Sequence, residues 1–210
     1  MQHFFHNMAN GTFLELGALD GLSVSNTKSL EDFMGWRGIL IEASPANHVR
    51  LVGNRPNAIR MHSAVCREDA QVHYMELDDQ AVKGIYEFMA PSFMQRWHPD
   101  FAQRVATDPS VLDELPVVHC LPLWRILQLL HIEHINFFVL DVEGAEYEIA
   151  RSINFNAVEF DVVVVEADEH SAEKNEAVRK LFVSNGYIYH GNTARNDWFV
   201  HAAFLPSEQH

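Results

Sequence analysis

Hydrophobic residues along the chain gather in short continuous runs, separated by segments in which apolar residues recur at helical spacing. Runs without alternation are typical of strands that are buried on both faces of a parallel sheet. We predict strands at residues 12–16, 38–41, 59–65, 117–121, 135–140, 161–165, 187–190 and 198–202. The last two runs predict a hairpin-type pair at the end of the chain.

Helices are predicted between these strands. One is expected at 23–33, with capping-type residues at its start, one at 45–52, with Pro45 in its first turn, and one after Ser171. Strands and helices that alternate in this way predict an α/β fold with a parallel sheet. Residues 79–115, rich in aromatic residues and proline, interrupt the alternation, and we interpret them as an insertion over the sheet.

The composition is that of one globular domain over residues 1–210, with 48% hydrophobic and 21% charged residues. A formal net charge of −14 argues against nucleic acid as a partner, because such partners require clustered Lys and Arg. No apolar run reaches the length of a membrane span, and no signal peptide is recognisable. Cys66 and Cys120 are too few for a disulfide framework, and we interpret them as free thiols of a cytoplasmic, reducing compartment.

The first predicted strand ends in the sequence GTFLELGALDG, which places Gly17 and Gly21 around Asp20. In an open α/β sheet, ligands bind beyond the carboxyl ends of the strands, and glycines allow the backbone to approach them closely. The G-x-x-x-G spacing is not the G-x-G-x-x-G fingerprint of dinucleotide sites. Acidic Glu15 and Asp20 suit a ligand with an amino group and a positive charge.

Two further strand ends complete the predicted ligand site. Glu42 follows the second strand, where an acidic side chain accepts hydrogen bonds from ribose hydroxyls. Ser63 and Ala64 follow at the third strand, where an adenine edge would lie. Taken together at three successive strand ends, these residues specify a ligand that carries adenosine and a cationic, amino-acid-like tail. S-adenosylmethionine fits this description. Taken singly, Glu42 is also explained as a solvated strand end and Asp20 as a turn former.

The segments GTFLELGALDGLSVSNT, GWRGILIEASP, NFFVLDVEGAE, FDVVVVE and NTARNDWFV resemble the FkbM-type family of S-adenosylmethionine-dependent methyltransferases. The resemblance implies a Rossmann-like class I methyltransferase fold, a mostly parallel seven-stranded sheet with helices on both faces, and methylation of a hydroxyl, on sugars or polyketides in known members. By the resemblance, Glu15, Gly17, Asp20 and Gly21 match the cofactor turn, Asn26 and Thr27 the methionine end, and Glu42 the ribose. We also predict cofactor contacts at Ala18, Ser63, Ala64 and Asp141. Family members usually have a helix before the first strand, so we expect a domain cut from a longer polypeptide, whose other domains would be partners.

Methyl transfer to an alcohol needs a base or a metal that lowers the pKa of the hydroxyl. Asp141, Glu143 and His170 are the candidates for the base, since they follow the two central strands. Asp141 and Glu166 end adjacent strands and are candidate ligands of Mg²⁺ or Mn²⁺. The alternative is that these carboxylates are helix caps.

The insertion at 79–115 is the predicted acceptor site. Tyr86, Phe88, Phe93 and Trp97 offer faces on which the ring of a carbohydrate, or of another hydroxyl-bearing acceptor, can stack. The alternative is that these aromatic residues form a small core of the insertion itself. The acidic surroundings disfavour an anionic acceptor.

Two other classes of protein remain as alternatives. One is a metal-dependent, carboxylate-rich hydrolase that uses Asp141, Glu166, Asp168 and His170, although it leaves the glycine turn unexplained. The other is a non-catalytic module that binds an adenosine ligand. An oxidoreductase is disfavoured, because the phosphate-binding glycine pattern is missing.

Overall fold

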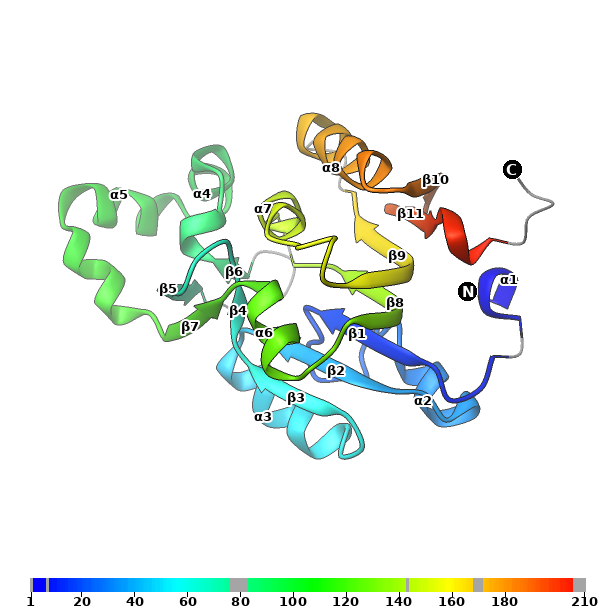
Figure 1. The fold of residues 1–210 in the computed structure, drawn as a ribbon. Helices are drawn as coiled ribbons and strands as arrows, with labels where there is room; N and C mark the ends of the chain where they lie inside the picture. The colour runs from blue at the N-terminus through cyan, green and yellow to red at the C-terminus, as the bar shows by residue number, and fades with distance from the viewer. Residues whose placement is uncertain (1, 7, 76–82, 143, 168–171, 206–210) are drawn as a thin grey trace.

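The computed structural model describes residues 2–6, 8–75, 83–142, 144–167 and 172–205, and of residues 2 and 3 only the backbone. Its main element is a seven-stranded sheet with the order β10-β11-β9-β8-β1-β2-β3 (Figure 1). Neighbouring strands pair in parallel, except that β11 is antiparallel to both β9 and β10. The strands are β1 (Thr12–Leu16), β2 (Arg37–Glu42), β3 (Ile59–His62), β8 (His134–Leu140), β9 (Glu159–Glu166), β10 (Tyr187–Thr193) and β11 (Asn196–His201).

Side chains on the two faces of this sheet form two hydrophobic layers. In β8, Phe138 and Leu140 belong to one layer, while Phe137 and Val139 belong to the other, as the alternation of a strand requires. Helices α6, α7 and α8 cover the first layer, and α1, α2 and α3 cover the second. The helices are α1 (Gln2–Phe5), α2 (Lys28–Met34), α3 (Pro45–Asn54), α6 (Leu123–Leu129), α7 (Glu146–Arg151) and α8 (Ala172–Ser184). The predicted α/β class, with helices on both faces of a mostly parallel sheet, is confirmed.

A second, four-stranded sheet with the order β4-β7-β5-β6 lies beside the main sheet, on the left in Figure 1. It carries two helices and two short 3-10 helices. These elements are β4 (Ala64–Val65), β5 (Ala70–Met75), β6 (Gly84–Ile85), η2 (Tyr86–Phe88), α4 (Pro91–Trp97), α5 (Pro99–Thr107), η3 (Pro109–Glu114) and β7 (Val117–Leu121), and a last 3-10 helix, η4 (Ala202–Phe204), follows β11. The strand predicted at 117–121 therefore exists, but it belongs to the small sheet.

The two cysteines form a disulfide across the small sheet, so the interpretation as free thiols is wrong. Cys66 follows β4, Cys120 lies in β7, and their Cα atoms are 5.8 Å apart. The parallel pairing of Ala64 with Cys120 brings the two cysteines together, although they are 54 positions apart in sequence. Sequence spacing alone gave no sign of this pairing. The cysteines therefore no longer support a reducing compartment.

Two other predicted elements are modified, both next to the site described below. The run 59–65 is not one strand, because Ser63 turns the chain from β3 into β4 and its hydroxyl donates to the carbonyl oxygens of Ala64 and His119. The helix expected at 23–33 begins only at Lys28. The hydroxyls of the residues before it donate to a buried carboxylate and do not cap the helix.

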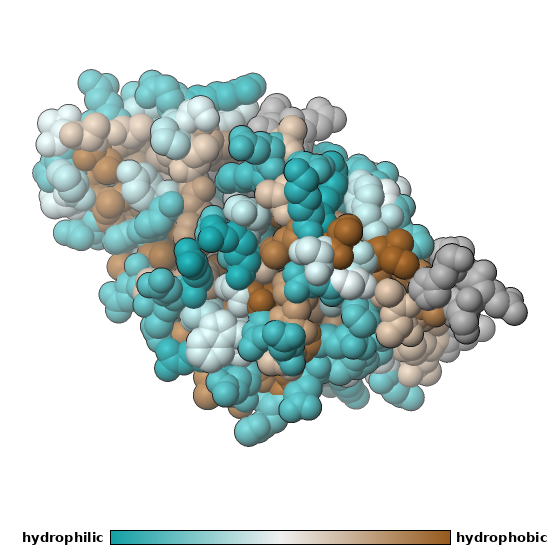
Figure 2. Space-filling view, turned by 45° about the horizontal axis from the view of Figure 1, so that its top comes forward, coloured by the Kyte–Doolittle hydropathy of each residue, from teal (hydrophilic) through white to brown (hydrophobic). Residues whose placement is uncertain are grey.

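The surface is mainly hydrophilic on the face shown in Figure 2, and its hydrophobic atoms lie in separate groups, one of them over the α4–α5 part. Among the described residues, no helix is both long and apolar enough to cross a membrane.

Candidate functional site

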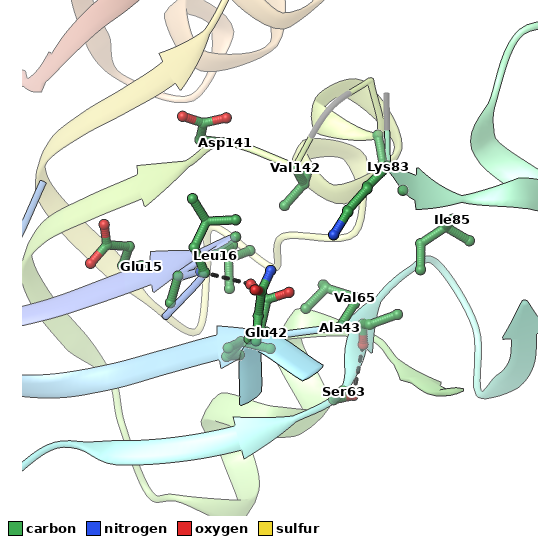
Figure 3. Close-up of a pocket in the computed structure, with 18 of the residues that line it drawn as sticks. Glu15, Leu16, Glu42, Ala43, Ser63, Val65, Lys83, Ile85, Asp141 and Val142 are labelled. Atoms are coloured by element: carbon green, nitrogen blue, oxygen red, sulfur yellow. Dashed lines mark hydrogen bonds between the residues drawn. The ribbon is translucent and has the colours of Figure 1, made fainter. Parts of the chain in front are cut away.

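A cavity lies beyond the carboxyl ends of β1, β2 and β8, between the main sheet and the small sheet (Figure 3). The strand order changes direction between β1 and β8, which is where open α/β sheets bind ligands. The main sheet, its loops and the junction of β3 with β4 line the cavity with residues that include Glu15, Gly17, Ala18, Asn26, Glu42, Asn47, Ser63, Ala64 and Asp141. The small-sheet side contributes Tyr74, Lys83, Ile85 and Phe88. We call these two sides the main-sheet wall and the small-sheet wall.

Gly17 brings the ends of three strands together. Its amide donates to the carbonyl oxygen of Ile41, 3.0 Å away, and its φ is +78°. A Cβ at this position would overlap the backbone oxygen of Asp141. Glycine is therefore required both by the left-handed backbone and by the close approach of β8, and it leaves the floor of the cavity open.

Glu42 holds the two loops that enter the cavity. Its Oε2 accepts a hydrogen bond of 2.7 Å from the amide of Leu19, and its Oε1 accepts one of 2.7 Å from the amide of Ser44. The residue is only 3% exposed. It is thus no solvated strand end, and its buried carboxylate lines the cavity.

Glu15 is equally buried and organises the loop that follows the glycine turn. It accepts hydrogen bonds from the hydroxyls of Ser25 and Thr27 and from the amide of Asn26, at 2.5–2.9 Å. Burial raises the pKa of Glu15, although these hydrogen bonds and the nearby charge of Arg55 oppose the rise. The sequence pointed to Glu15 as a ligand contact, and the structure adds this organising role.

Three of the expected cofactor residues lie outside the lining that the described residues define. Asp20 closes its own turn by accepting from the amides of Leu22 and Ser23. Burial opposes its ionisation, but the hydrogen bonds from Ser23 and Leu22 prevail, and the pKa of Asp20 is lowered. Gly21 and Thr27 contact buried Arg55, which donates to the carbonyl of Gly21 and to the hydroxyl of Thr27.

The predicted adenine contacts do reach the cavity. Ser63 and Ala64 line it where β3 passes into β4, and the amide of Ser63 donates to the carbonyl of Glu42. Ala18 lies opposite, next to Gly17. These residues have small side chains, so a flat ligand can approach the backbone closely.

Asn47 is a site residue that the sequence reasoning missed. It is 1% exposed, and its amide nitrogen Nδ2 has no hydrogen-bond partner among the described residues. Arg50 donates to Oδ1 of Asn47, which fixes the orientation of the amide group. An unpaired buried donor is unfavourable, so Nδ2 is suited to a ligand that brings an acceptor. Asn47 lies in the first turn of α3, where nothing in the sequence separates it from an ordinary helix residue.

Asp141 and Glu166, at the ends of adjacent strands, are brought together. Burial raises the pKa of Asp141, and the hydrogen bond with Glu166 and the charge of Arg195 oppose the rise. Glu166 also accepts a hydrogen bond from Arg195 at 3.0 Å. A guanidinium against one of the two carboxylates disfavours a divalent cation between them. Glu143 and His170, the other expected catalytic residues, lie outside the described residues.

The aromatic residues of the insertion divide into two groups. Phe88 lines the cavity, as expected for an acceptor contact. The ring of Tyr86 contacts Phe101, and that of Phe93 contacts Trp97. Most of these rings therefore pack within the insertion, which was the alternative interpretation.

Lys83 is a second residue that the sequence reasoning missed. Its amine points into the cavity from just before β6 (Figure 3), across from the acidic main-sheet wall. A lone lysine in an irregular segment carries no sequence signal. Only the folding of the small sheet against the main sheet places it over the site.

The class of protein follows from this arrangement. The main sheet has seven strands, one of them reversed, and helices cover both of its faces. Acidic residues at the carboxyl ends of its strands line the cavity. This is the architecture of Rossmann-like class I methyltransferases. The chain belongs to the FkbM family of S-adenosylmethionine-dependent methyltransferases, because residues 15–189 match the Methyltransferase FkbM domain. The resemblance stated from the sequence is confirmed. No curated protein matches the chain significantly.

Solved structures with a similar fold include three methyltransferase-related proteins. The FkbM methyltransferase from Methylobacillus flagellatus KT has 12% identity and a TM-score of 0.48, with 92% of this chain and 44% of that protein covered. Aeropyrum pernix fibrillarin, solved with natively bound S-adenosyl-L-methionine, has 12% identity, a TM-score of 0.46 and coverages of 92% and 68%. Precorrin-6y C5,15-methyltransferase from Geobacter metallireducens GS-15 has 12% identity, a TM-score of 0.44 and coverages of 92% and 80%. The chain thus spans less than half of the first of these proteins.

Proposed function

We propose that the protein is an S-adenosylmethionine-dependent O-methyltransferase that methylates a hydroxyl group of a sugar or a similar polyol. The observation that carries the proposal is the unpaired buried donor of Asn47, beside Glu42, in a cavity of an FkbM-family chain. The cavity needs a ligand that accepts from Asn47 and donates to carboxylates, and an adenosine with a cationic tail does both.

The main-sheet wall would hold the methyl donor. We assign the ribose hydroxyls to Glu42, an acceptor on the ribose to Nδ2 of Asn47, and the adenine to the segment of Ser63 and Ala64. The turn at Gly17 leaves room for the methionine part, near the carboxylate of Glu15. Bound there, S-adenosylmethionine supplies a methyl group on a positively charged sulfur.

Asp141 is the base in this proposal. Its carboxylate would take the proton of the acceptor hydroxyl, whose oxygen would receive the methyl group that S-adenosylmethionine supplies, with S-adenosylhomocysteine as the leaving product. A raised pKa makes Asp141 a stronger base than an exposed aspartate, and Glu166 with Arg195 holds it in position. Transfer requires the oxygen and the carbon to lie about 3 Å apart, so positioning is the main task of the site.

The small-sheet wall would hold the acceptor. Phe88 and Tyr74 offer ring faces for stacking, and Lys83 offers a donor for a hydroxyl or another oxygen. The hydrolase alternative is weaker, since Glu166 is engaged by Arg195 and Asp141 and does not line the cavity among the described residues. The non-catalytic module remains a direct competitor, which only turnover excludes.

Calorimetric titration with S-adenosylmethionine and S-adenosylhomocysteine tests the proposal. Glu42→Ala should weaken both ligands by about 1–3 kcal/mol, because buried hydrogen bonds to a charged group are lost. Glu148→Ala on α7, whose side chain is 43% exposed, is the matched control and should bind normally. Equal binding by Glu42→Ala and the native chain would remove Glu42 from the site.

Turnover is measured as S-adenosylhomocysteine formed with a panel of neutral monosaccharide glycosides. Asp141→Asn should lower turnover at least about 100-fold, the usual contribution of a general base, while donor binding persists. Tight donor binding without turnover on any acceptor would favour the non-catalytic module.

A further inference from the structure

We propose that His134, Glu159 and Asp161 form a binding site for Zn²⁺ at the end of the main sheet opposite the cavity. His134 and Glu159 are paired at the first residues of the parallel strands β8 and β9, and Asp161 follows two residues later. β8 spans roughly 20 Å from His134 to its carboxyl end near Asp141, at about 3.3 Å per residue. The site is therefore separate from the methyl-transfer cavity and does not depend on the proposed function.

The three side chains are close enough to share one ion. Nε2 of His134 lies 2.8 Å from Oδ1 of Asp161. One ligand atom from each of the three residues lies within 4.8 Å of the other two. Zinc bonds of about 2.0–2.2 Å to nitrogen and oxygen place two ligands of one ion roughly 3–4 Å apart. Small side-chain rotations therefore suffice to bring the ligands around an ion.

His201 supplies an independent observation. This residue ends β11, next to β9, and its Nδ1 atom is buried without a hydrogen-bond partner among the described residues. The same atom lies 3.7 Å from Oε2 of Glu159, which is too long for a hydrogen bond but suits two ligands of one ion. His201 is thus a candidate for the fourth ligand.

The charges at this end of the sheet also favour a cation. Among the described residues, Glu159 and Asp161 form ion pairs only with histidines, His201 and His134, and with no lysine or arginine. With neutral histidines, two negative charges lie on one strand two residues apart. Asn136 donates to Oδ2 of Asp161 at 2.7 Å and so orients the carboxylate, as supporting groups do at metal sites.

The types of ligand select the metal. Imidazole together with carboxylate oxygen is typical of Zn²⁺, whereas Mg²⁺ and Ca²⁺ prefer oxygen alone. A bound ion would join β8, β9 and β11 across their pairing. We therefore assign the site a structural role, in which the ion stabilises the main sheet.

Titration of the metal-free chain of residues 1–210 with Zn²⁺ tests the inference, with heat and melting temperature as readouts. We expect saturable binding that raises the melting temperature, and no response to millimolar Mg²⁺. His134→Ala should weaken Zn²⁺ binding at least about ten-fold, since even supporting residues contribute that much. His131→Ala, an exposed residue three positions earlier, is the matched control and should leave binding unchanged.

Glu159→Gln is a second variant at an exposed position, in case His134→Ala is unstable. If neither variant weakens Zn²⁺ binding, the ion occupies another of the thirteen histidines and the inference is wrong. No binding at 100-fold excess over protein would overturn it as well. Binding of S-adenosylmethionine is measured in parallel and should be the same with and without Zn²⁺, so failure of the zinc site is distinguishable from failure of the proposed function.

Discussion

The two walls of the cavity are held in different ways. The main-sheet wall rests on a buried polar network around Arg55, which is 0% exposed and donates to Glu31, Gly21, Ser25 and Thr27. Its ion pair with Glu31 is 2.7 Å long and has side chains 0% and 8% exposed. Buried networks of this kind tolerate few arrangements, because each unpaired member is costly.

The small sheet, together with its helices, has no ion pair of this kind among its described residues. Arg104 with Glu114 and His119 with Asp69 form largely exposed pairs there. The small sheet is held by backbone pairing, a small hydrophobic cluster and the disulfide. Under the proposed function, the main-sheet wall, held by a buried network, would bind the methyl donor, and the small-sheet wall would bind the acceptor.

Arg55→Ala should have the largest effect, because it leaves Glu31 and Glu15 without their buried cation. We expect a loss of about 3–5 kcal/mol in the free energy of unfolding, measured with urea. Arg104→Ala, on α5 beside the small sheet, is the matched change and should cost less than about 1 kcal/mol, as exposed pairs do. Similar losses in the two variants would contradict the contrast between the walls.

Removing the disulfide tests how the small-sheet wall is held. The double variant Cys66→Ala and Cys120→Ala should lose about 2–4 kcal/mol of stability relative to the oxidised chain. A reductant should destabilise the native chain by a similar amount and leave the double variant unchanged. A native chain that is indifferent to reductant would mean that the two thiols are not bonded in solution.

The sequence predicted those parts of the walls whose interacting residues lie close together in the chain or follow a general rule of topology. Glu15, Glu42 and Asp141 were predicted, because each ends an apolar run and the carboxyl ends of parallel strands meet at one edge. The apolar runs themselves predicted the main sheet nearly strand by strand. These inferences depend only on local patterns and on one general rule of topology.

The small-sheet wall escaped prediction because its contacts join distant segments. The bond between Cys66 and Cys120 depends on the pairing of β4 with β7, and β4 has only two residues. Lys83 reaches the cavity only because β6 pairs with β5. Asn47 was missed for another reason. That its Nδ2 atom has no hydrogen-bond partner among the described residues can be recognised only from the three-dimensional structure.

Lys83→Met should affect the acceptor and not the donor, if the small-sheet wall binds the acceptor. We expect the KM for the best glycoside acceptor to rise roughly ten-fold, as for a lost hydrogen bond to a charged group. The affinity for S-adenosylmethionine should stay within about two-fold. Lys180→Met on α8, 76% exposed, is the control. A large loss of donor affinity would instead assign Lys83 to the donor side.

The smallest effect is expected for Arg195→Gln, which changes the charge next to the proposed base Asp141. As a base, Asp141 acts in its ionised form, so kcat/KM should rise with pH through its pKa, which burial places above the ordinary 3.8. Arg195→Gln removes a positive charge that favours ionisation, so the midpoint of this rise should move to higher pH. Because Arg195 is 63% exposed and screened by water, the shift should be less than about one pH unit. Arg151→Gln, on α7 and engaged with Glu148, should leave the midpoint in place. A shift to lower pH in Arg195→Gln would mean that a different group titrates, and with it that Asp141 is not the base.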